Sequence, residues 1–115
     1  MSKVNAYLRD ILDSARLIQD YLKGMSFGDF ESDTVRQDAA MRRFEIIGEA
    51  TERLSAEVRA QFPGIPWELA AGMRDVLIHD HDDVNLEIIW TTVRDNLPGL
   101  IQQLEAYLAQ RPPVE

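Results

Sequence analysis

The chain contains no cysteine, two histidines and fewer basic than acidic residues. The absence of cysteine excludes disulfides and zinc sites built on thiolates, which is consistent with a reducing cytoplasm. Lysine and arginine number 12 against 20 aspartates and glutamates, so the net charge is −8. This charge argues against broad, non-specific binding of nucleic acids, which needs many basic contacts. It remains compatible with a small cleft that binds one or two phosphates, and with a basic protein partner.

Long hydrophobic runs are also absent. No apolar segment follows residues 1–5, so no signal peptide is expected. No stretch approaches the roughly 20 apolar residues that a membrane span needs. We therefore expect a cytoplasmic protein without a membrane partner. With 115 residues and 45% hydrophobic composition, the chain is expected to form one domain over residues 1–110. Residues 111–115 are expected to be a frayed C-terminal tail.

The apolar residues recur with helical spacing along nearly the whole chain, without a strand pattern. A first stripe steps by three and four residues from Val4 to Leu22, and Gly24 is expected to end that helix. Residues 25–31 are expected to form a loop. Ser32 or Asp33 is placed to cap a second helix.

The later helices are marked by turn residues and caps. The second helix runs on, or kinks near Ser55, toward residue 62. Pro66 is placed as the first residue of a third helix, and Asn85 as the cap of the next. Pro98 should kink or split the final stripe after Leu97. The pattern predicts an all-α antiparallel bundle of four to five helices.

Both histidines lie in segment 74–81, which reads Arg-Asp-Val-Leu-Ile-His-Asp-His. Arg74 is a permanent cation that matches phosphate geometry, and His79 is suited to proton transfer near neutral pH. Together they can cleave a phosphodiester without a metal or cofactor. A structural alternative is that Arg74 pairs with a carboxylate while His79 lies at the negative end of a helix.

Three other sets of residues each allow a functional and a structural interpretation. The run of residues 79–83 contains two histidines and three aspartates but matches no strong metal motif, so a solvated acidic turn is favoured. Glu45 and Glu49 lie four apart and can do acid–base work, yet ion pairs with neighbouring arginines are favoured. A set of arginines is either a strip for RNA contact or a solvated face: Arg36, Arg42 and Arg43.

Four segments in this order resemble the HepT-like proteins of the HEPN superfamily, the toxin halves of HEPN/MNT toxin–antitoxin pairs. The segments are Phe44-Glu45-Ile46-Ile47-Gly48-Glu49-Ala50, Ile65-Pro66-Trp67, Met73-Arg74-Asp75-Val76-Leu77-Ile78-His79 and Val84-Asn85-Leu86-Glu87-Ile88-Ile89-Trp90. The resemblance covers the chain from about Val4 to Leu108.

The resemblance implies a homodimeric, HEPN-like fold and metal-independent cleavage of RNA rather than DNA. It implies that Arg74 and His79 line a cleft at the dimer interface, and that Asp75 is the polar residue that usually follows the arginine. It also implies a small MNT-type nucleotidyltransferase as antitoxin. Some of these antitoxins transfer AMP to a tyrosine two residues after the motif histidine. His81 occupies that position here, so no modification residue is predicted and His81 is expected to support the site.

The sequence is also compatible with a second function class. The chain can instead be a non-catalytic helical partner that binds nucleotide or substrate and orients a nucleotidyltransferase. The negative charge and the missing tyrosine favour this reading, whereas the intact Arg74 and His79 favour the ribonuclease.

Overall fold

The computed structural model describes residues 3–72 and 85–110. Within these ranges the chain is helical, and no described residue lies in a strand. The helices are α1 (Lys3–Leu22), α2 (Phe27–Glu31), α3 (Thr34–Glu52), α4 (Ala56–Ala60), α6 (Leu86–Asp95) and α7 (Leu97–Leu108), and residues 67–72 are also helical. The all-α expectation is confirmed. The structure has two further short helices, because α2 forms where a loop was expected and α4 is separate from the second helix.

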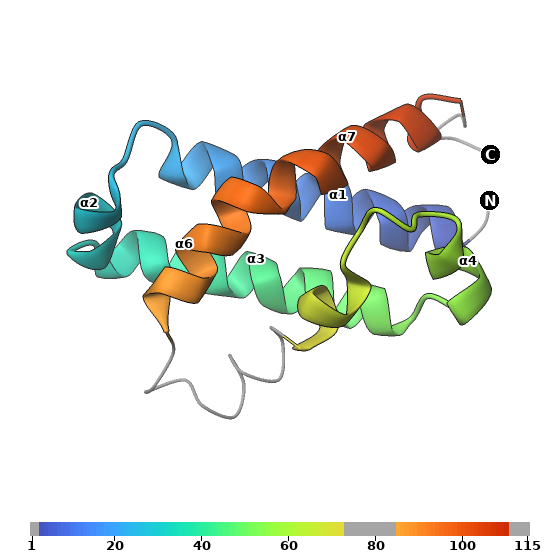
Figure 1. The fold of residues 1–115 in the computed structure, drawn as a ribbon, viewed down its shortest axis with the longest axis horizontal. Coiled ribbons are helices and arrows are strands. Elements are labelled where there is room, and N and C mark those ends of the chain that lie inside the picture. Colours follow the sequence, from blue (N-terminus) through green and yellow to red (C-terminus); the bar gives the residue numbers. More distant parts are fainter. Residues whose placement is uncertain (1–2, 73–84, 111–115) are drawn as a thin grey trace.

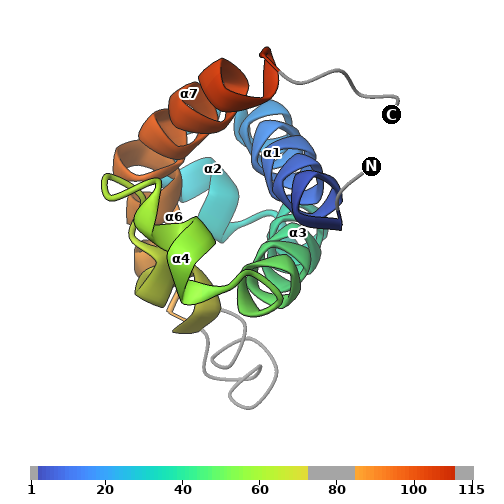
Figure 2. The same cartoon turned by 90° about the vertical axis from the view of Figure 1, so that its right-hand side faces the viewer.

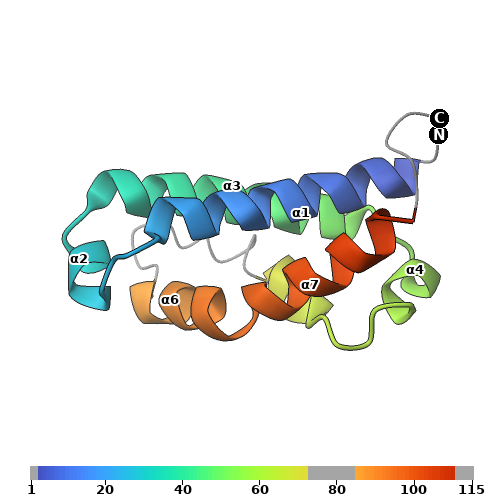
Figure 3. The same cartoon turned by 90° about the horizontal axis from the view of Figure 1, so that it is seen from above.

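The helices form two layers (Figure 3). The long antiparallel helices α1 and α3 make one layer, while α6, α7 and the helical segment 67–72 make the other (Figure 1). Seen end-on, the helices surround a common interior (Figure 2). Helices α2 and α4 lie at opposite ends of the bundle.

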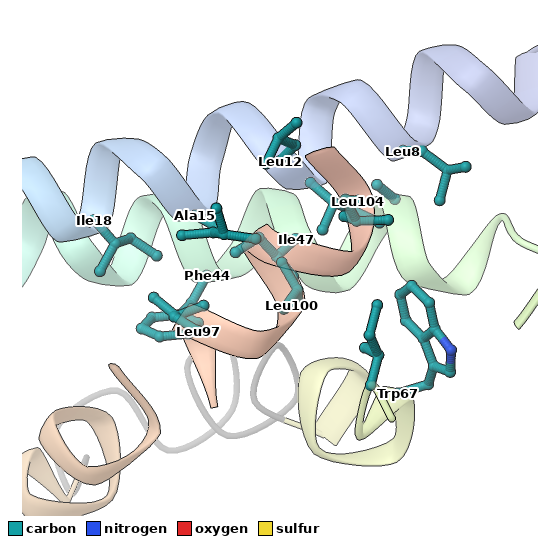
Figure 4. Close-up of a cluster of buried hydrophobic side chains, with 14 of the residues drawn as sticks. Leu8, Leu12, Ala15, Ile18, Phe44, Ile47, Trp67, Leu97, Leu100 and Leu104 are labelled. Carbon is teal, nitrogen blue, oxygen red and sulfur yellow. The ribbon is translucent and has the colours of Figure 1, made fainter. Parts of the chain in front are cut away.

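The apolar stripe of α1 supplies one wall of the core. Its buried hydrophobic residues are Leu8, Ile11, Leu12, Ala15, Ile18 and Leu22. Side chains of α3 and α7 meet them, including Phe44, Ile47, Leu97, Leu100 and Leu104 (Figure 4). Gly24 has a φ of 78°, which favours glycine after a helix end, so the predicted stop of α1 is confirmed.

The segment expected to be a loop contains a helix. Ser26 caps α2: its Oγ accepts a hydrogen bond from Asp29 N at 3.1 Å, and Asp29 Oδ2 accepts one from Ser26 N at 3.1 Å. This reciprocal pair satisfies two amide groups that the first turn leaves free. Phe30 is fully buried, so the short helix closes one end of the core.

Caps and prolines set the remaining boundaries. Asp33 caps α3, as expected, and accepts a hydrogen bond from Arg36 N at 3.0 Å. The kink expected near Ser55 is a full break, with Ser55 capping α4 through Val58 N at 3.2 Å. Pro98 lies in the first turn of α7. The stripe therefore divides at residue 96, slightly before the expected point, because proline is tolerated where a helix begins.

Candidate active site

The predicted site residues Arg74, Asp75, His79 and His81 lie outside the described residues, as does the acidic run that continues to residue 83. The structure therefore describes the residues that precede and follow the predicted site in the sequence. Residues 63–72 lead into it and Asn85 follows it.

The helical segment 67–72 begins at a proline turn. Leu69 N and Ala70 N both donate hydrogen bonds to Pro66 O, at 3.0 and 3.2 Å. Pro66 directly precedes the helical residues, so its missing N–H costs no helical hydrogen bond. Ile65 is 4% exposed and ties the turn to the core. The helical residues therefore begin one position after the predicted start at Pro66.

Trp67 connects this segment to the rest of the bundle. The indole is 7% exposed and meets the ring of Phe62 edge-on, with 6.1 Å between ring centroids. Its Nε1 donates a hydrogen bond to Arg59 O at 2.9 Å. Figure 4 shows Trp67 at the end of the core cluster, close to the segment that precedes the predicted site. Trp67 is therefore a core residue whose single polar atom is paired with the backbone of α4.

A narrow apolar pocket of about 20 Å³ lies beside the helical segment. Its lining residues come from three parts of the fold: Phe44 and Ile47 of α3, Pro66, Leu69 and Ala70, and Thr92, Asn96, Leu97 and Leu100 around the α6–α7 junction. A space of this size holds about one water molecule. It is too small for an organic cofactor.

The element that follows the predicted site in the sequence is α6, whose N-terminus is capped. Asn85 Oδ1 accepts hydrogen bonds from Glu87 N at 2.9 Å and Ile88 N at 3.4 Å, which confirms the predicted cap of α6. Ile88 is 51% exposed and Leu69 is 37% exposed. Large apolar side chains therefore lie at the surface both before and after residues 73–84 in the sequence.

The arginines proposed as an RNA strip are not equivalent. Arg36 donates a hydrogen bond to Tyr21 O and lies 3.9 Å from Asp33 Oδ2, so its guanidinium contacts two groups of the bundle. Arg42 and Arg43 make no ion pair with a carboxylate of the described residues. Among the three, Arg42 and Arg43 are therefore better suited to a phosphate contact.

Arg94 is an exposed cation paired with its neighbour. Its Nε and Nη2 donate to Asp95 Oδ1 and Oδ2 at 2.8 and 3.0 Å. These hydrogen bonds lower the pKa of Asp95 and raise the pKa of Arg94, so the pair stays ionised near neutral pH. The pair neutralises itself and leaves little net charge to attract RNA.

The ion pairs expected for two glutamates of α3 do not form among the described residues. Glu45 and Glu49 are half-buried, and neither makes an ion pair with another residue in ranges 3–72 and 85–110. Within the same ranges, no group of three histidines or carboxylates is arranged to bind a metal. The possible metal ligands in residues 79–83 lie outside them.

Comparison with known proteins assigns the family. The family described as Ribonuclease HepT-like matches residues 11–107, a range that includes all four predicted site residues. The chain belongs to this HepT-like ribonuclease family, which confirms the resemblance noted in the sequence.

Two relatives illustrate the similarity. "Putative RNase TTE0752" of Caldanaerobacter subterraneus subsp. tengcongensis is 41% identical over 108 residues, which are 94% of this chain and 96% of that protein. "Probable ribonuclease HepT" of Thermococcus cleftensis is 37% identical over 99 residues, which are 86% of this chain and 90% of that protein. The comparison with solved structures found no significant match.

Proposed function

We propose that the chain is the endoribonuclease toxin of a HEPN/MNT-type toxin–antitoxin pair, with Arg74 and His79 as its catalytic residues. The observation that carries the proposal is the family match over residues 11–107, within which the Arg-x4-His motif is intact. The names of the relatives support action on RNA.

The proposed reaction needs no metal and no cofactor. The ribose 2′-hydroxyl attacks the adjacent phosphorus, the bond from phosphorus to the 5′-oxygen breaks, and a 2′,3′-cyclic phosphate and a 5′-hydroxyl result. One imidazole takes the proton of the 2′-hydroxyl and another donates a proton to the leaving oxygen. Arg74 binds the phosphate and stabilises its developing negative charge. Each proton removed is matched by one supplied.

A homodimer supplies both imidazoles. Residues five apart on a regular helix are separated by about 140°, so Arg74 and His79 cannot face the same way from one such helix. In a twofold dimer, the two copies of His79 share the roles of base and acid. The exposed Leu69 and Ile88, which flank the motif in the sequence, support a contact between copies.

The proposed partner is a small MNT-type nucleotidyltransferase. His81 lacks the hydroxyl that accepts AMP in some relatives, so we propose that the antitoxin acts mainly by covering the dimer cleft. Aspartates in residues 80–83 offer a negative surface to basic residues of that partner. In this arrangement His81 is an additional imidazole of the cleft.

Expression in a bacterial host tests the function. The wild-type chain should stop growth, whereas Arg74→Ala and His79→Ala variants should be tolerated at equal levels of folded protein. Arg94→Ala is the matched control, because Arg94 is exposed and its charge is already paired with Asp95. Purified wild-type protein should still cleave RNA in EDTA, and loss of cleavage on chelation would support a metal site instead. Full RNA cleavage by either folded site variant excludes that residue as catalytic, whereas a folded wild-type chain that cleaves no RNA favours the non-catalytic partner of a nucleotidyltransferase.

A further inference from the structure

One arginine joins three consecutive elements of the fold. Arg59 Nε and Nη2 both donate hydrogen bonds to Leu54 O, at 3.1 and 3.0 Å, just beyond the end of α3. The carbonyl oxygen of the same Arg59, in α4, accepts the 2.9 Å hydrogen bond from Trp67 Nε1. We call these two linked contacts the Arg59–Trp67 brace. The brace connects the end of α3, through α4, to the first residue of the helical segment 67–72.

Aromatic packing holds the indole in the orientation that this hydrogen bond requires. Phe62 is 4% exposed and meets both Trp67 and Tyr107 edge-on, at centroid distances of 6.1 and 5.0 Å. Edge-to-face pairs of this kind restrict how a ring can tilt. Because Tyr107 belongs to α7, this packing fixes the indole against α7, while the brace connects it to the end of α3.

The other residues of the segment are more exposed than Trp67. Leu69 and Ala70 line the narrow apolar pocket, and Leu69 is 37% exposed. Of residues 67–72, only Trp67 is buried, so its contacts are the strongest constraint that the structure shows on this segment.

We propose that Trp67 is a positioning residue, which sets the direction of the chain as it approaches the predicted catalytic residues through the Arg59–Trp67 brace. The inference rests on the proposed ribonuclease function for its effect on catalysis. Small displacements of a catalytic group reduce the rate of the chemical step. Loss of the brace should therefore lower kcat and leave KM nearly unchanged.

The test compares Trp67→Phe with Trp90→Phe. Phenylalanine at residue 67 retains an aromatic ring beside Phe62 but loses the donor to Arg59. Trp90 is the matched control, because its ring contacts Phe27 and Phe30 at the other end of the bundle. We expect kcat to fall about tenfold in Trp67→Phe, with KM changed by less than about twofold. The control should keep the wild-type kcat even if its Tm falls by a similar amount.

Hydrogen exchange provides a readout that does not depend on activity. Amides of residues 68–72 should exchange faster in Trp67→Phe than in Trp90→Phe, while those of α1 exchange alike. If Trp67→Phe does not fold, Arg59→Met tests the other half of the brace, since it keeps an unbranched stem but removes both donors to Leu54 O. Unchanged exchange at residues 68–72 overturns the proposal, as does an equal loss of kcat in the control. If the wild-type chain cleaves no RNA, the proposed function fails while the exchange comparison still decides the brace.

Discussion

The rings of Phe62 and Tyr107 meet edge-on, with 5.0 Å between their centroids and 71° between their planes. Phe62 follows α4 and Tyr107 lies in the last turns of α7, so this contact connects two elements 45 residues apart in the sequence. Phe62 also contacts Trp67. The stability of this end of the bundle therefore depends strongly on one phenylalanine.

Phe62→Ala should reduce the free energy of unfolding by about 3–5 kcal/mol, because it removes a buried ring and leaves a cavity between Trp67 and Tyr107. Urea denaturation followed by circular dichroism measures the change. Val35→Ala is the control: Val35 is 75% exposed, and its variant should differ from wild type by less than about 0.5 kcal/mol. Equal stability of Phe62→Ala and wild type contradicts the proposed packing role.

Two asparagines precede consecutive helices and differ in one respect. Asn85 accepts hydrogen bonds from the first turn of α6, whereas the side chain of Asn96 makes no capping bond to α7. Asn85→Ala should therefore cost about 1 kcal/mol of stability, and Asn96→Ala clearly less. Thermal or urea unfolding of the two variants side by side tests this, and an equal loss in both contradicts the assignment of the cap.

The protein should be a dimer in solution. Arg74 and His79 need a second copy to complete the proposed site, and stable homodimer interfaces commonly bury on the order of 2,000 Å² or more. Light scattering at micromolar concentration should give about twice the chain mass of 13.1 kDa. A monomer mass under conditions where RNA is cleaved rules out a shared site. An Ile88→Asp variant should weaken the dimer if the exposed Ile88 lies in the interface.

His81 should carry no stable AMP. A phosphoramidate on an imidazole hydrolyses readily, so it makes a poor lasting block, and we expect the antitoxin to inhibit by covering the cleft. The experiment is co-expression with the candidate antitoxin, followed by intact-mass spectrometry of the purified chain. A stable AMP-sized addition that maps to His81 would falsify this expectation. An addition at another residue leaves the argument about His81 intact but excludes occlusion as the main mode of inhibition.

Local sequence signals predicted most helix boundaries. The glycine after α1 and Asn85 before α6 were assigned correctly, and Asp33 was one of two candidates for the cap of α3, because a cap depends on residues within four positions of it. Helix α2 was missed. Its signal was present as Ser26 three residues before Asp29, but its few apolar residues are too short a stretch to show helical periodicity.

Only part of the candidate site was predictable from the sequence. Residue types and spacing identified Arg74 and His79 as candidates, and the family match includes both. The sequence did not predict which arginines of α3 contact other groups of the bundle. Arg36 bonds Tyr21 O, 15 residues earlier in the chain, and this contact depends on how α3 is placed against the end of α1.

The sequence by itself determined the all-α class and the family, and it supplied the candidate site residues, because periodicity, caps and motif spacing are local properties of the chain. Tertiary structure alone decided that Arg59 O accepts a hydrogen bond from the indole of Trp67. It also decided that Phe62 lies between Trp67 and Tyr107, and that Leu69 borders a narrow pocket. These contacts join residues across turns and between layers. They follow from the packing of whole helices, which periodicity along one helix does not specify.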